Sequence, residues 1–462
     1  MSFSTLVFIY LFLPLFLLLY TLVRPGRRII LLIFSLIFYA WGEPVYVVLL
    51  MLLAVFNYFS ALDLGDLVAG GRGTRGALIV NIAGNLAILA FFKYVPWIIG
   101  LVNGGFGLAI PVPELTLPAG LSFIVFRAMG YIFDVRSGKI KAERNFLTFA
   151  LFLAMFPTLA MGPIDRYGDV RNALERPRPN FRKMTAGVSL FLKGLAKKVL
   201  LADTIVLLYQ TMKAAEGPST VLMTWLGMLA FTFQLYFDFS GYSDMARGLG
   251  GMLGIPVSRN FDYPYTAISV TDFWRRWHIS LSSWFRDYVY IPLGGSRVPP
   301  ARHIANLLIV WMLTGLWHGA SFSFILWGLY YGVLLILEKY LFGRKLETLP
   351  VAARRIITFF LAVIGWTFFQ SSSLPQALTE IKALFGIGTA GFADSTALYA
   401  LRTNLLPLLV CIFFATPVPE TLFVRMEKRN PALASLILFL IFVLSTAFMV
   451  YNTYQPFLYA QF

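Results

Sequence analysis

The feature that most constrains this chain is the recurrence of apolar runs of about the length that crosses a lipid bilayer. A helix needs roughly 20 mostly apolar residues to span the hydrocarbon core, and such runs include Leu6 to Val23, Val45 to Leu62 and Leu436 to Tyr451. The length criterion predicts about 11 to 13 segments, some short enough to be re-entrant. Hydrophobic residues make up 58% of the chain and charged residues only 13%. We therefore expect an all-α, polytopic membrane protein.

The polar segments between these runs are too short to form separate domains. One extends from Asp63 to Arg75, is rich in glycine and charge, and predicts a solvated loop between spans. The other extends from Asp165 to Lys183 and contains the string RPRPN, in which the prolines oppose a helix. No internal repeat of the kind that marks many transporters is found. One continuous membrane domain over residues 1–462 is expected.

The formal net charge is +16, but the basic residues are gathered in short clusters between apolar runs. Cytoplasmic loops of membrane proteins carry such clusters, so they favour cytoplasmic loops over a nucleic-acid surface. The first apolar run has no basic residue before it and the string RPGRR after it, which predicts a retained span with the amino terminus outside. The clusters are Arg24, Arg27 and Arg28; Lys193, Lys197 and Lys198; and Arg354 and Arg355.

Cysteine usage excludes several kinds of site. Cys411 is the only cysteine and lies in an apolar run. The chain therefore has no disulfide of its own, no thiolate metal cluster and no pair of catalytic cysteines. No metal site is expected.

His318 is the most unusual ionisable residue, because it stands alone in the apolar string LTGLWHGASFSFILWGLYYG. An ionisable side chain at membrane depth costs on the order of 2 to 3 kcal/mol, so such residues usually line a cavity or do chemistry. The alternative is a neutral imidazole bonded to a neighbouring helix. Trp317 precedes it and is a candidate wall of a substrate site.

His278 lies in the string FWRRWHISLSSWFRDYVYIPLGG, in which Phe273, Trp277 and Trp284 recur at helical spacing. This pattern predicts an amphipathic helix at the membrane interface. Its arginines are either headgroup anchors or ligands for phosphates of a donor such as coenzyme A. Arg275 and Arg276 are the candidates for that second role.

Two acids and a third histidine complete the candidates. Asp238 and Asp244, in FQLYFDFSGYSDMARGLGGMLG, are candidate substrate-binding residues in a wet cavity. A structural ion pair is the favoured alternative, because an acid within a membrane usually needs a partner. His303 follows a double proline and is expected to be a solvated loop residue.

Around His278 and His318 the sequence resembles that of the membrane-bound O-acyltransferase family, in particular its bacterial alginate O-acetyltransferase branch. The resemblance covers nearly the whole chain. The strings that carry it include LPAGLSFIVFRAMGYIFDV from Leu117, QLYFDFSGYSDMARGLGGMLGI from Gln234, RNFDYPY from Arg259, FWRRWHISLSSWFRDYVYIPLGGSR from Phe273, TGLWHGASFSFILWGLYYG from Thr314 and NTYQPFLYAQF at the carboxyl terminus.

The resemblance implies helices around a central funnel or tunnel in a bacterial cytoplasmic (inner) membrane. It implies that His318 is the catalytic histidine and that His278 is the second family histidine. It also implies an acyl group, acetyl being favoured, that passes from a cytoplasmic thioester such as acetyl-CoA to a polysaccharide outside. A periplasmic or extracellular acetyltransferase would be the partner, and no tightly bound cofactor is expected.

These residues support direct transfer with His318 as general base. A positioned imidazole contributes about 100-fold to 10,000-fold in such a step, and its ordinary pKa near neutrality makes the neutral form available. No G-x-S-x-G elbow for a covalent serine intermediate lies beside it. His278 could orient the donor, bond the oxyanion or support His318.

Three other functions compete with this interpretation. The same fold could transfer D-alanine from a carrier protein to teichoic acid. A transporter or flippase would also have many spans and buried acids, but the repeats typical of transporters are missing. A scaffold without activity is disfavoured, because both histidines are retained.

Overall fold

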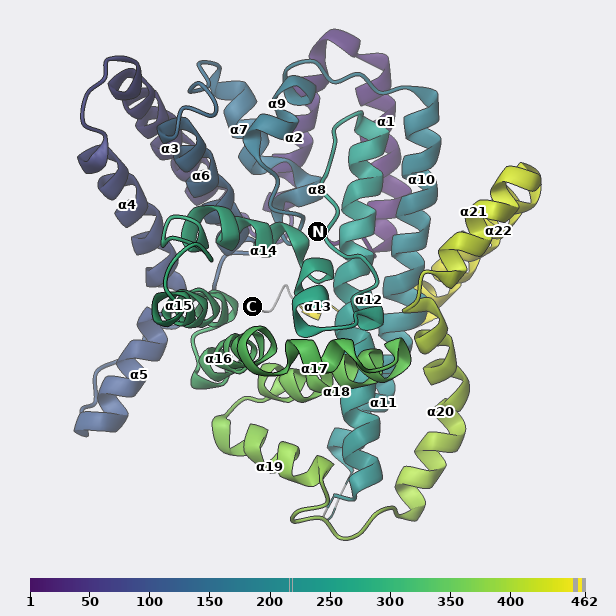
Figure 1. Cartoon of the computed structure of the whole chain (residues 1–462). Helices are drawn as coiled ribbons and strands as arrows, with labels where there is room; N and C mark the ends of the chain where they lie inside the picture. The colour runs from purple at the N-terminus through teal and green to yellow at the C-terminus, as the bar shows by residue number, and fades with distance from the viewer. Residues whose placement is uncertain (216, 218, 452–455, 459–462) are drawn as a thin grey trace. The chain divides into compact units, whose positions relative to one another are not determined.

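The computed structural model describes residues 1–215, 217, 219–451 and 456–458, and these residues form helices and connecting segments without any strand. The predicted all-α class is confirmed (Figure 1). The chain divides into two compact units. Unit 1 comprises Met1–Phe191 and Tyr242–Arg259, and unit 2 comprises Leu192–Gly241 and Asn260–Leu458. A single membrane domain stays a prediction.

Unit 1 holds the first helices of the chain. Several begin at residues that suit a helix amino terminus, such as the Asn145 side chain, which accepts a hydrogen bond from the Thr148 N–H at the start of α7. The helices are α1 (Leu13–Leu22), α2 (Arg27–Ala40), α3 (Tyr46–Ala69), α4 (Arg75–Lys93), α5 (Val95–Phe106), α6 (Leu121–Arg136), α7 (Phe146–Ala154), α8 (Phe156–Leu159) and α9 (Tyr167–Glu175).

Unit 2 holds the later helices, and two helices contribute to both units. The shared helices are α10 (Phe181–Ala196) and α12 (Val221–Leu253). The others are α11 (Asp203–Ala214), α13 (Val270–Arg276), α14 (Ile279–Phe285), α15 (Pro300–His318), α16 (Phe322–Leu337), α17 (Gly343–Glu347), α18 (Val351–Gln370), α19 (Leu374–Leu384), α20 (Ser395–Phe414), α21 (Val418–Arg429) and α22 (Pro431–Tyr451).

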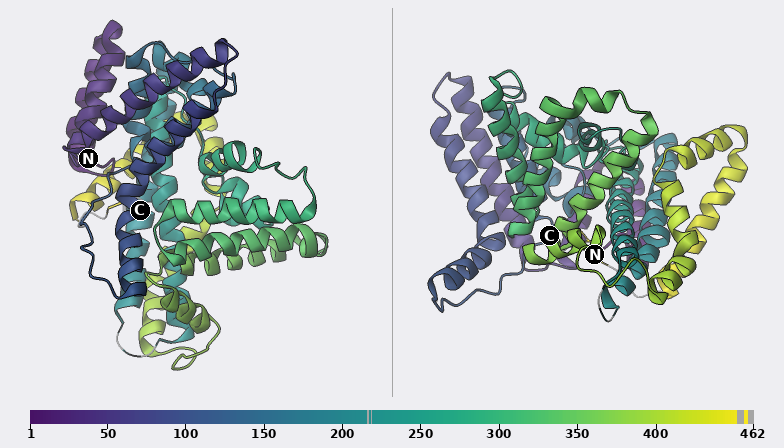
Figure 2. Two further views of the ribbon diagram at one scale, coloured as in Figure 1. Left: turned by 90° about the vertical axis from the view of Figure 1, so that its left-hand side faces the viewer. Right: turned by 60° about the horizontal axis from the view of Figure 1, so that its bottom comes forward.

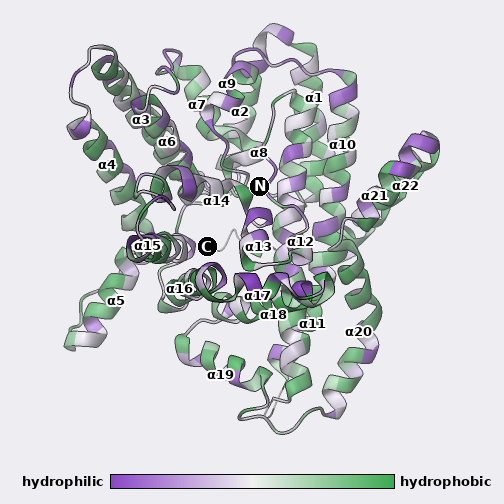
Figure 3. Cartoon of the chain, in the orientation of Figure 1, coloured by the Kyte–Doolittle hydropathy of each residue, from purple (hydrophilic) through white to green (hydrophobic). Residues whose placement is uncertain are grey.

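Seven helices of the described chain are long and apolar enough to cross a membrane, and the bent pair Phe8–Leu22 and Arg24–Ala40 would make an eighth. The seven are α3, α4, α12, α16 with its continuation to Glu347, α18, α20 and α22. Figure 3 shows α20 and α22 as hydrophobic along most of their length. This confirms a multi-pass membrane protein. Fewer helices than apolar runs pass the test, because several runs form short or broken helices.

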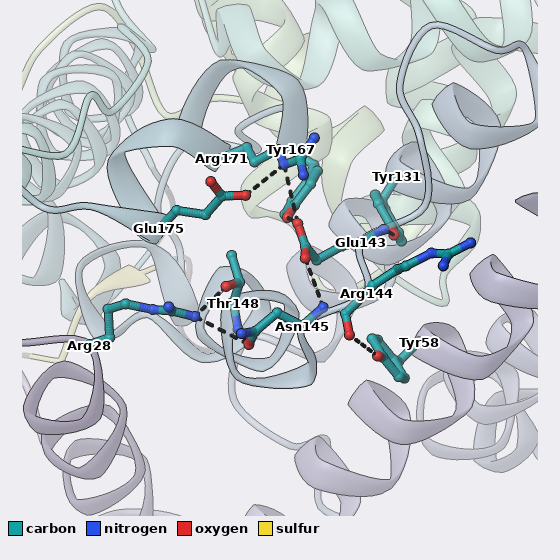
Figure 4. A network of polar contacts seen from close by, with 10 residues as sticks. All are labelled: Arg28, Tyr58, Tyr131, Glu143, Arg144, Asn145, Thr148, Tyr167, Arg171 and Glu175. Carbon is teal, nitrogen blue, oxygen red and sulfur yellow. Dashed lines mark hydrogen bonds and ion pairs between the residues drawn. The ribbon is translucent and has the colours of Figure 1, made fainter.

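A polar network fixes the connection between α6 and α7 in unit 1 (Figure 4). Buried Glu143 accepts a hydrogen bond from the Tyr167 hydroxyl at 2.6 Å and pairs with Arg171 at 3.2 Å. The backbone N–H of Glu143 donates to the Tyr131 hydroxyl at 2.7 Å. Tyr167 and Arg171 both contact Oε2 of Glu143, and the Asn145 N–H donates to its Oε1 at 2.8 Å. Each carboxylate oxygen therefore has a partner, as a buried charge requires, and the network has a structural role.

Three predicted loops are partly or wholly helical. The segment from Asp63 to Arg75 is non-helical only over residues 70–74, and Arg354 and Arg355 lie within α18. The cluster from Lys193 to Lys198 is helical, not a loop, because it continues from α10 into the π-helical turn Lys197–Ala202. Two of its charges are paired within the protein, since Lys193 pairs with Glu420 at 3.1 Å and buried Lys198 pairs with Asp238 at 2.6 Å. The RPRPN string is non-helical as predicted. Only residues 456–458 of the carboxyl-terminal string NTYQPFLYAQF lie within the described part of the chain.

The prediction of a solvated loop at His303 is also wrong. Pro299 and Pro300 start α15 instead of breaking it, because proline fits the first position of a helix. His303 is only 2% exposed. Its Nε2 atom lies 2.7 Å from the Tyr290 hydroxyl and its Nδ1 atom lies 2.8 Å from the Tyr340 hydroxyl.

Candidate functional site

The helices α15 and α16 form a tight antiparallel hairpin that carries the WHG string at its turn (Figures 1 and 2). Glycine makes this packing possible. A Cβ atom at Gly315 would come closer than 3.0 Å to the carbonyl oxygen of Phe324, and one at Gly328 would do the same to that of Trp311. After the turn, the Ser321 hydroxyl accepts the N–H of Phe324 and caps α16.

His318 is the last residue of α15 and is only 3% exposed. Aromatic rings surround its imidazole. The distances between ring centroids are 4.8 Å to Trp327, 4.9 Å to Trp317 and 5.3 Å to Phe369. The hairpin therefore buries an ionisable group between aromatic walls, in a setting with a low local dielectric.

His278 occupies a break between two short helices, so the predicted continuous amphipathic helix is wrong. The helix α13 ends at Arg276, Trp277 is extended, and His278 adopts a left-handed conformation with φ of 44° before α14 begins. Such a conformation costs a non-glycine residue about 1 to 3 kcal/mol and is found most often at functional sites. The break turns Trp277 and His278 into the core, where each is 1% exposed.

Asn260 holds this break in place. Its carbonyl oxygen accepts the N–H of Ile279 at 2.9 Å, and its side-chain oxygen accepts the N–H and the hydroxyl of Ser280 at 3.1 and 2.9 Å. On the other side of the break, the N–H of Asp262 donates to the carbonyl oxygen of Arg276 at 2.9 Å. These bonds offset the strain at His278. The role of Asn260 was not predicted, although it lies in the string RNFDYPY.

Trp317 packs against both His278 and His318. Its ring lies 5.8 Å from the imidazole of His278 and 4.9 Å from that of His318, measured between centroids. Phe239 of α12 covers another side of His278, at 4.8 Å. The structure therefore brings His278, Trp317 and His318 into one aromatic site within unit 2.

Burial decides the protonation of His278 and the role of its aromatic neighbours. Removal from water lowers the pKa of His278 to about 3, because burial disfavours the charged imidazolium. His278 is therefore neutral at physiological pH. Phe273, Trp277 and Trp284 are all nearly inaccessible, so the alternative that these rings anchor the segment at lipid headgroups is wrong.

The two candidate arginines lie at the end of α13, outside the aromatic site. Arg275 is exposed. Arg276 is partly exposed and pairs with Asp272 at 2.9 Å, four residues earlier on the same helix. Such a pair contributes only a few tenths of a kcal/mol to stability. Both guanidinium groups lie close in sequence to His278 and keep their role as candidates for donor phosphates.

The two candidate acids have different settings. Asp238 is buried and pairs with Lys198 at 2.6 Å, and the Leu458 N–H donates to it at 2.7 Å. Lys198 also pairs with Asp203, at 2.8 Å. These contacts are the ones expected if Asp238 forms a structural ion pair. Asp244 pairs with Arg247 at 3.3 Å and belongs to unit 1, whereas the histidines belong to unit 2.

Comparison with known proteins gives a family for this arrangement. The model of MBOAT, the membrane-bound O-acyltransferase family, matches residues 120–375. That range contains both histidines, Trp317 and Asn260.

Curated relatives match over most of the chain. A probable alginate O-acetylase of Pseudomonas aeruginosa is 42% identical over 397 residues, which cover 84% of this chain and 76% of the relative. A peptidoglycan O-acetyltransferase of Helicobacter pylori is 33% identical over 83% of this chain and 80% of the relative. A teichoic acid D-alanyltransferase of Bacillus subtilis is 28% identical over 54% of this chain and 68% of the relative.

Proposed function

The chain belongs to the membrane-bound O-acyltransferase family and is an O-acyltransferase; we propose that it moves an acetyl group from a cytoplasmic thioester to hydroxyl groups of an extracytoplasmic polysaccharide. The observation that carries this proposal is the burial of His318 between Trp317, Trp327 and Phe369 at the turn of the α15–α16 hairpin. Acyl transfer needs such a base in a place that water does not reach.

The reaction that we propose is a direct transfer. The neutral imidazole of His318 takes the proton of the acceptor hydroxyl as its oxygen attacks the thioester carbonyl carbon. The carbonyl π electrons move to oxygen and form a tetrahedral oxyanion. When the oxyanion collapses, the carbon–sulfur bond breaks and the thiolate receives the proton from the imidazolium. The products are an ester and a free thiol, and His318 is neutral again.

His278 and Trp317 position the reactants in this proposal. His278 is neutral, and Asn260 and Ser280 fix the backbone around it. Trp317 contacts both imidazoles and forms the wall between them. We assign His278 to orienting the donor thioester or supporting His318, which predicts that its loss costs less turnover than the loss of His318.

Acetyl-CoA is the donor that we propose, with Arg275 and Arg276 as ligands for its phosphates. Arg275 is exposed, and a guanidinium group suits a phosphate because it offers several parallel donors. The same pair could serve another activated acyl group with a phosphate-bearing carrier. Asp238 and Asp244 are proposed to act indirectly, through the ion pairs that fix α12.

The relatives support the proposed acceptor class. Two relatives named for O-acetylation cover more than four fifths of this chain, whereas the relative named for D-alanylation covers about half of it. We therefore favour acetylation of a polysaccharide over D-alanylation of teichoic acid. An extracytoplasmic acetyltransferase that completes delivery to the polymer is the proposed partner.

The proposed location is the bacterial cytoplasmic membrane, with the amino terminus outside and the Arg24–Arg28 turn in the cytoplasm. Positive charge resists translocation, and this segment begins the second arm of a helix pair bent by 114°. Single cysteines placed in the turn, in a Cys411→Ala background, should react with a membrane-impermeant maleimide only after the membrane is opened. If these cysteines react in intact cells, the orientation is the opposite of the one proposed.

A donor and acceptor assay tests the proposed function. The purified protein in lipid nanodiscs would receive either radiolabelled acetyl-CoA or a D-alanyl carrier protein, with mannuronan oligosaccharides, muropeptides or lipoteichoic acid as acceptor. We expect label from acetyl-CoA in a sugar ester and release of CoA thiol. Transfer from the D-alanyl carrier alone would contradict the acetyl proposal.

A further inference from the structure

Trp327 lies against the proposed base from the opposite helix of the hairpin. It is located on α16, two turns from the WHG string, and is fully buried. Its ring lies 4.8 Å from that of His318 and is nearly perpendicular to it, at 82°. Phe369 of α18 packs against both rings, at 5.4 Å from Trp327 and 5.3 Å from His318.

The indole N–H of Trp327 is buried and has no hydrogen-bond acceptor among the residues that the structure describes. Leaving a buried donor unsatisfied costs about 1 to 3 kcal/mol. Folded proteins satisfy the large majority of buried polar groups, and an exception is often explained by catalysis or by a bound molecule. Phenylalanine would fill much of the same space without this cost.

Two indoles that do not contact His318 serve as a comparison. The N–H groups of Trp274 and Trp366 are also buried without an acceptor in the described chain. Within that part of the chain, the only one of the three rings in contact with the imidazole of His318 is that of Trp327. Of these three indole donors, that of Trp327 is therefore the one beside His318.

We propose that Trp327 is a catalytic residue whose indole N–H donates a hydrogen bond to the acyl carbonyl oxygen. This inference rests on the proposed function, because it requires an acyl group at His318. An indole is only a donor, which suits an oxygen that gains negative charge. As the acceptor oxygen attacks the carbonyl carbon, the π electron pair moves onto the carbonyl oxygen, and the N–H bond strengthens without transfer of its proton. When the carbon–sulfur bond breaks, the carbonyl is restored.

The hydrogen bond from Trp327 should stabilise the transition state more than the ground state. A preorganised donor aimed at a developing oxyanion acts in a place without competing water. Removal of one such donor from an enzyme typically lowers turnover by about 100-fold to 1,000-fold. Because the bond strengthens as charge develops, its loss should lower kcat and leave the KM for the donor nearly unchanged.

The test compares Trp327→Phe with Trp274→Phe. Both changes remove a buried N–H without an acceptor in the described structure, and both replace an indole by a phenyl ring in the same group of aromatic side chains. Acetyl-CoA is the donor, and CoA release and ester formation are measured together with the thermal midpoint. We expect kcat to fall by about 100-fold for Trp327→Phe and by less than about 3-fold for Trp274→Phe, with similar thermal midpoints.

An isosteric replacement separates the N–H from the shape of the ring. Incorporation of β-(3-benzothienyl)alanine at position 327 exchanges the N–H for sulfur and keeps the bicyclic ring. The proposal predicts a loss of kcat close to that of Trp327→Phe. If the benzothienyl protein, with a wild-type thermal midpoint, turns over at the wild-type rate, the N–H has no catalytic role and the inference is overturned.

Parallel measurement of His318→Ala distinguishes this inference from the proposed function. If His318→Ala abolishes transfer while the benzothienyl protein is fully active, the inference fails and the proposed base stands. If His318→Ala transfers acetyl at the wild-type rate, the assignment of His318 as the base fails, and the inference fails with it. If the wild-type protein transfers no acetyl group from acetyl-CoA, the proposed function itself fails.

Discussion

The two ends of α15 each bury a histidine, and their surroundings differ. Near the amino-terminal end, His303 lies between two hydroxyl groups, those of Tyr290 and Tyr340, with the Lys339 ammonium 3.4 Å from its Nε2 atom. At the carboxyl-terminal end, His318 lies between aromatic rings in the turn of a glycine-packed hairpin. Hydrogen bonds on both ring nitrogens favour a structural role for His303. The aromatic setting of His318 favours a reactive one.

Breaking the hairpin should have the largest effect on stability. Gly328→Ala places a Cβ atom against the backbone carbonyl of Trp311, which cannot move without shifting α15. We expect a loss of about 3 kcal/mol in the free energy of unfolding and loss of transfer. Gly104→Ala in α5, where nothing lies within 4 Å of the new atom, is the control. Equal thermal midpoints for the two variants would contradict the tight packing.

Removing His303 should affect stability and spare chemistry. His303→Ala leaves the hydroxyl groups of Tyr290 and Tyr340 without their partner, which should cost about 2 kcal/mol. The thermal midpoint should fall, while turnover per folded molecule stays near the wild-type value. A folded His303→Ala protein with severely reduced turnover would remove the contrast between the two ends of α15.

Changing Asn260 tests whether its hydrogen bonds hold the break at His278 in place. Asn260→Ala removes the acceptor for the N–H and hydroxyl of Ser280 and should cost about 1 kcal/mol. Turnover should fall by about 10-fold through misplacement of His278. Asn260→Asp keeps an acceptor oxygen and should recover most of the rate. If neither change alters turnover in a folded protein, the geometry at His278 does not matter for transfer.

The exposed end of α13 should show the smallest effect. Changing Arg275 and Arg276 to Gln removes two partly or fully exposed charges, so the thermal midpoint should hardly change. If they bind donor phosphates, the KM for acetyl-CoA should rise by a few-fold and become less sensitive to salt. A KM and salt dependence equal to those of the wild type would exclude phosphate binding by this pair.

Apolar runs and the strings around the histidines predicted the all-α membrane fold and the importance of the α15–α16 hairpin. The prediction succeeded there because the information is local: about 20 apolar residues form a span, and an isolated histidine among aromatics is conspicuous. The three histidines of the chain were all noticed, although the setting of His303 was misjudged.

The errors arose where a distant residue decides the local structure. Helical spacing from Phe273 to Trp284 predicted one helix, but hydrogen bonds that Asn260 accepts from Ile279 and Ser280 stabilise a break at His278. The Lys193–Lys198 cluster has the composition of a loop, but Glu420 and Asp238 pair with Lys193 and Lys198 in a helix. The double proline before His303 was interpreted as a turn, although it starts a helix. Local periodicity contains no information on such partners.

Single-turnover transfer by His318→Ala tests the central claim most directly. Acetyl-CoA is saturating, and the acceptor is present at less than one equivalent of the enzyme. Rapid quenching then measures ester formation without contributions from product release. We expect His318→Ala to fold and bind donor like the wild type but to form ester at least about 100-fold more slowly. His303→Ala should form ester at nearly the wild-type rate. Ester formation by His318→Ala at the wild-type rate would contradict the assignment of His318 as the base.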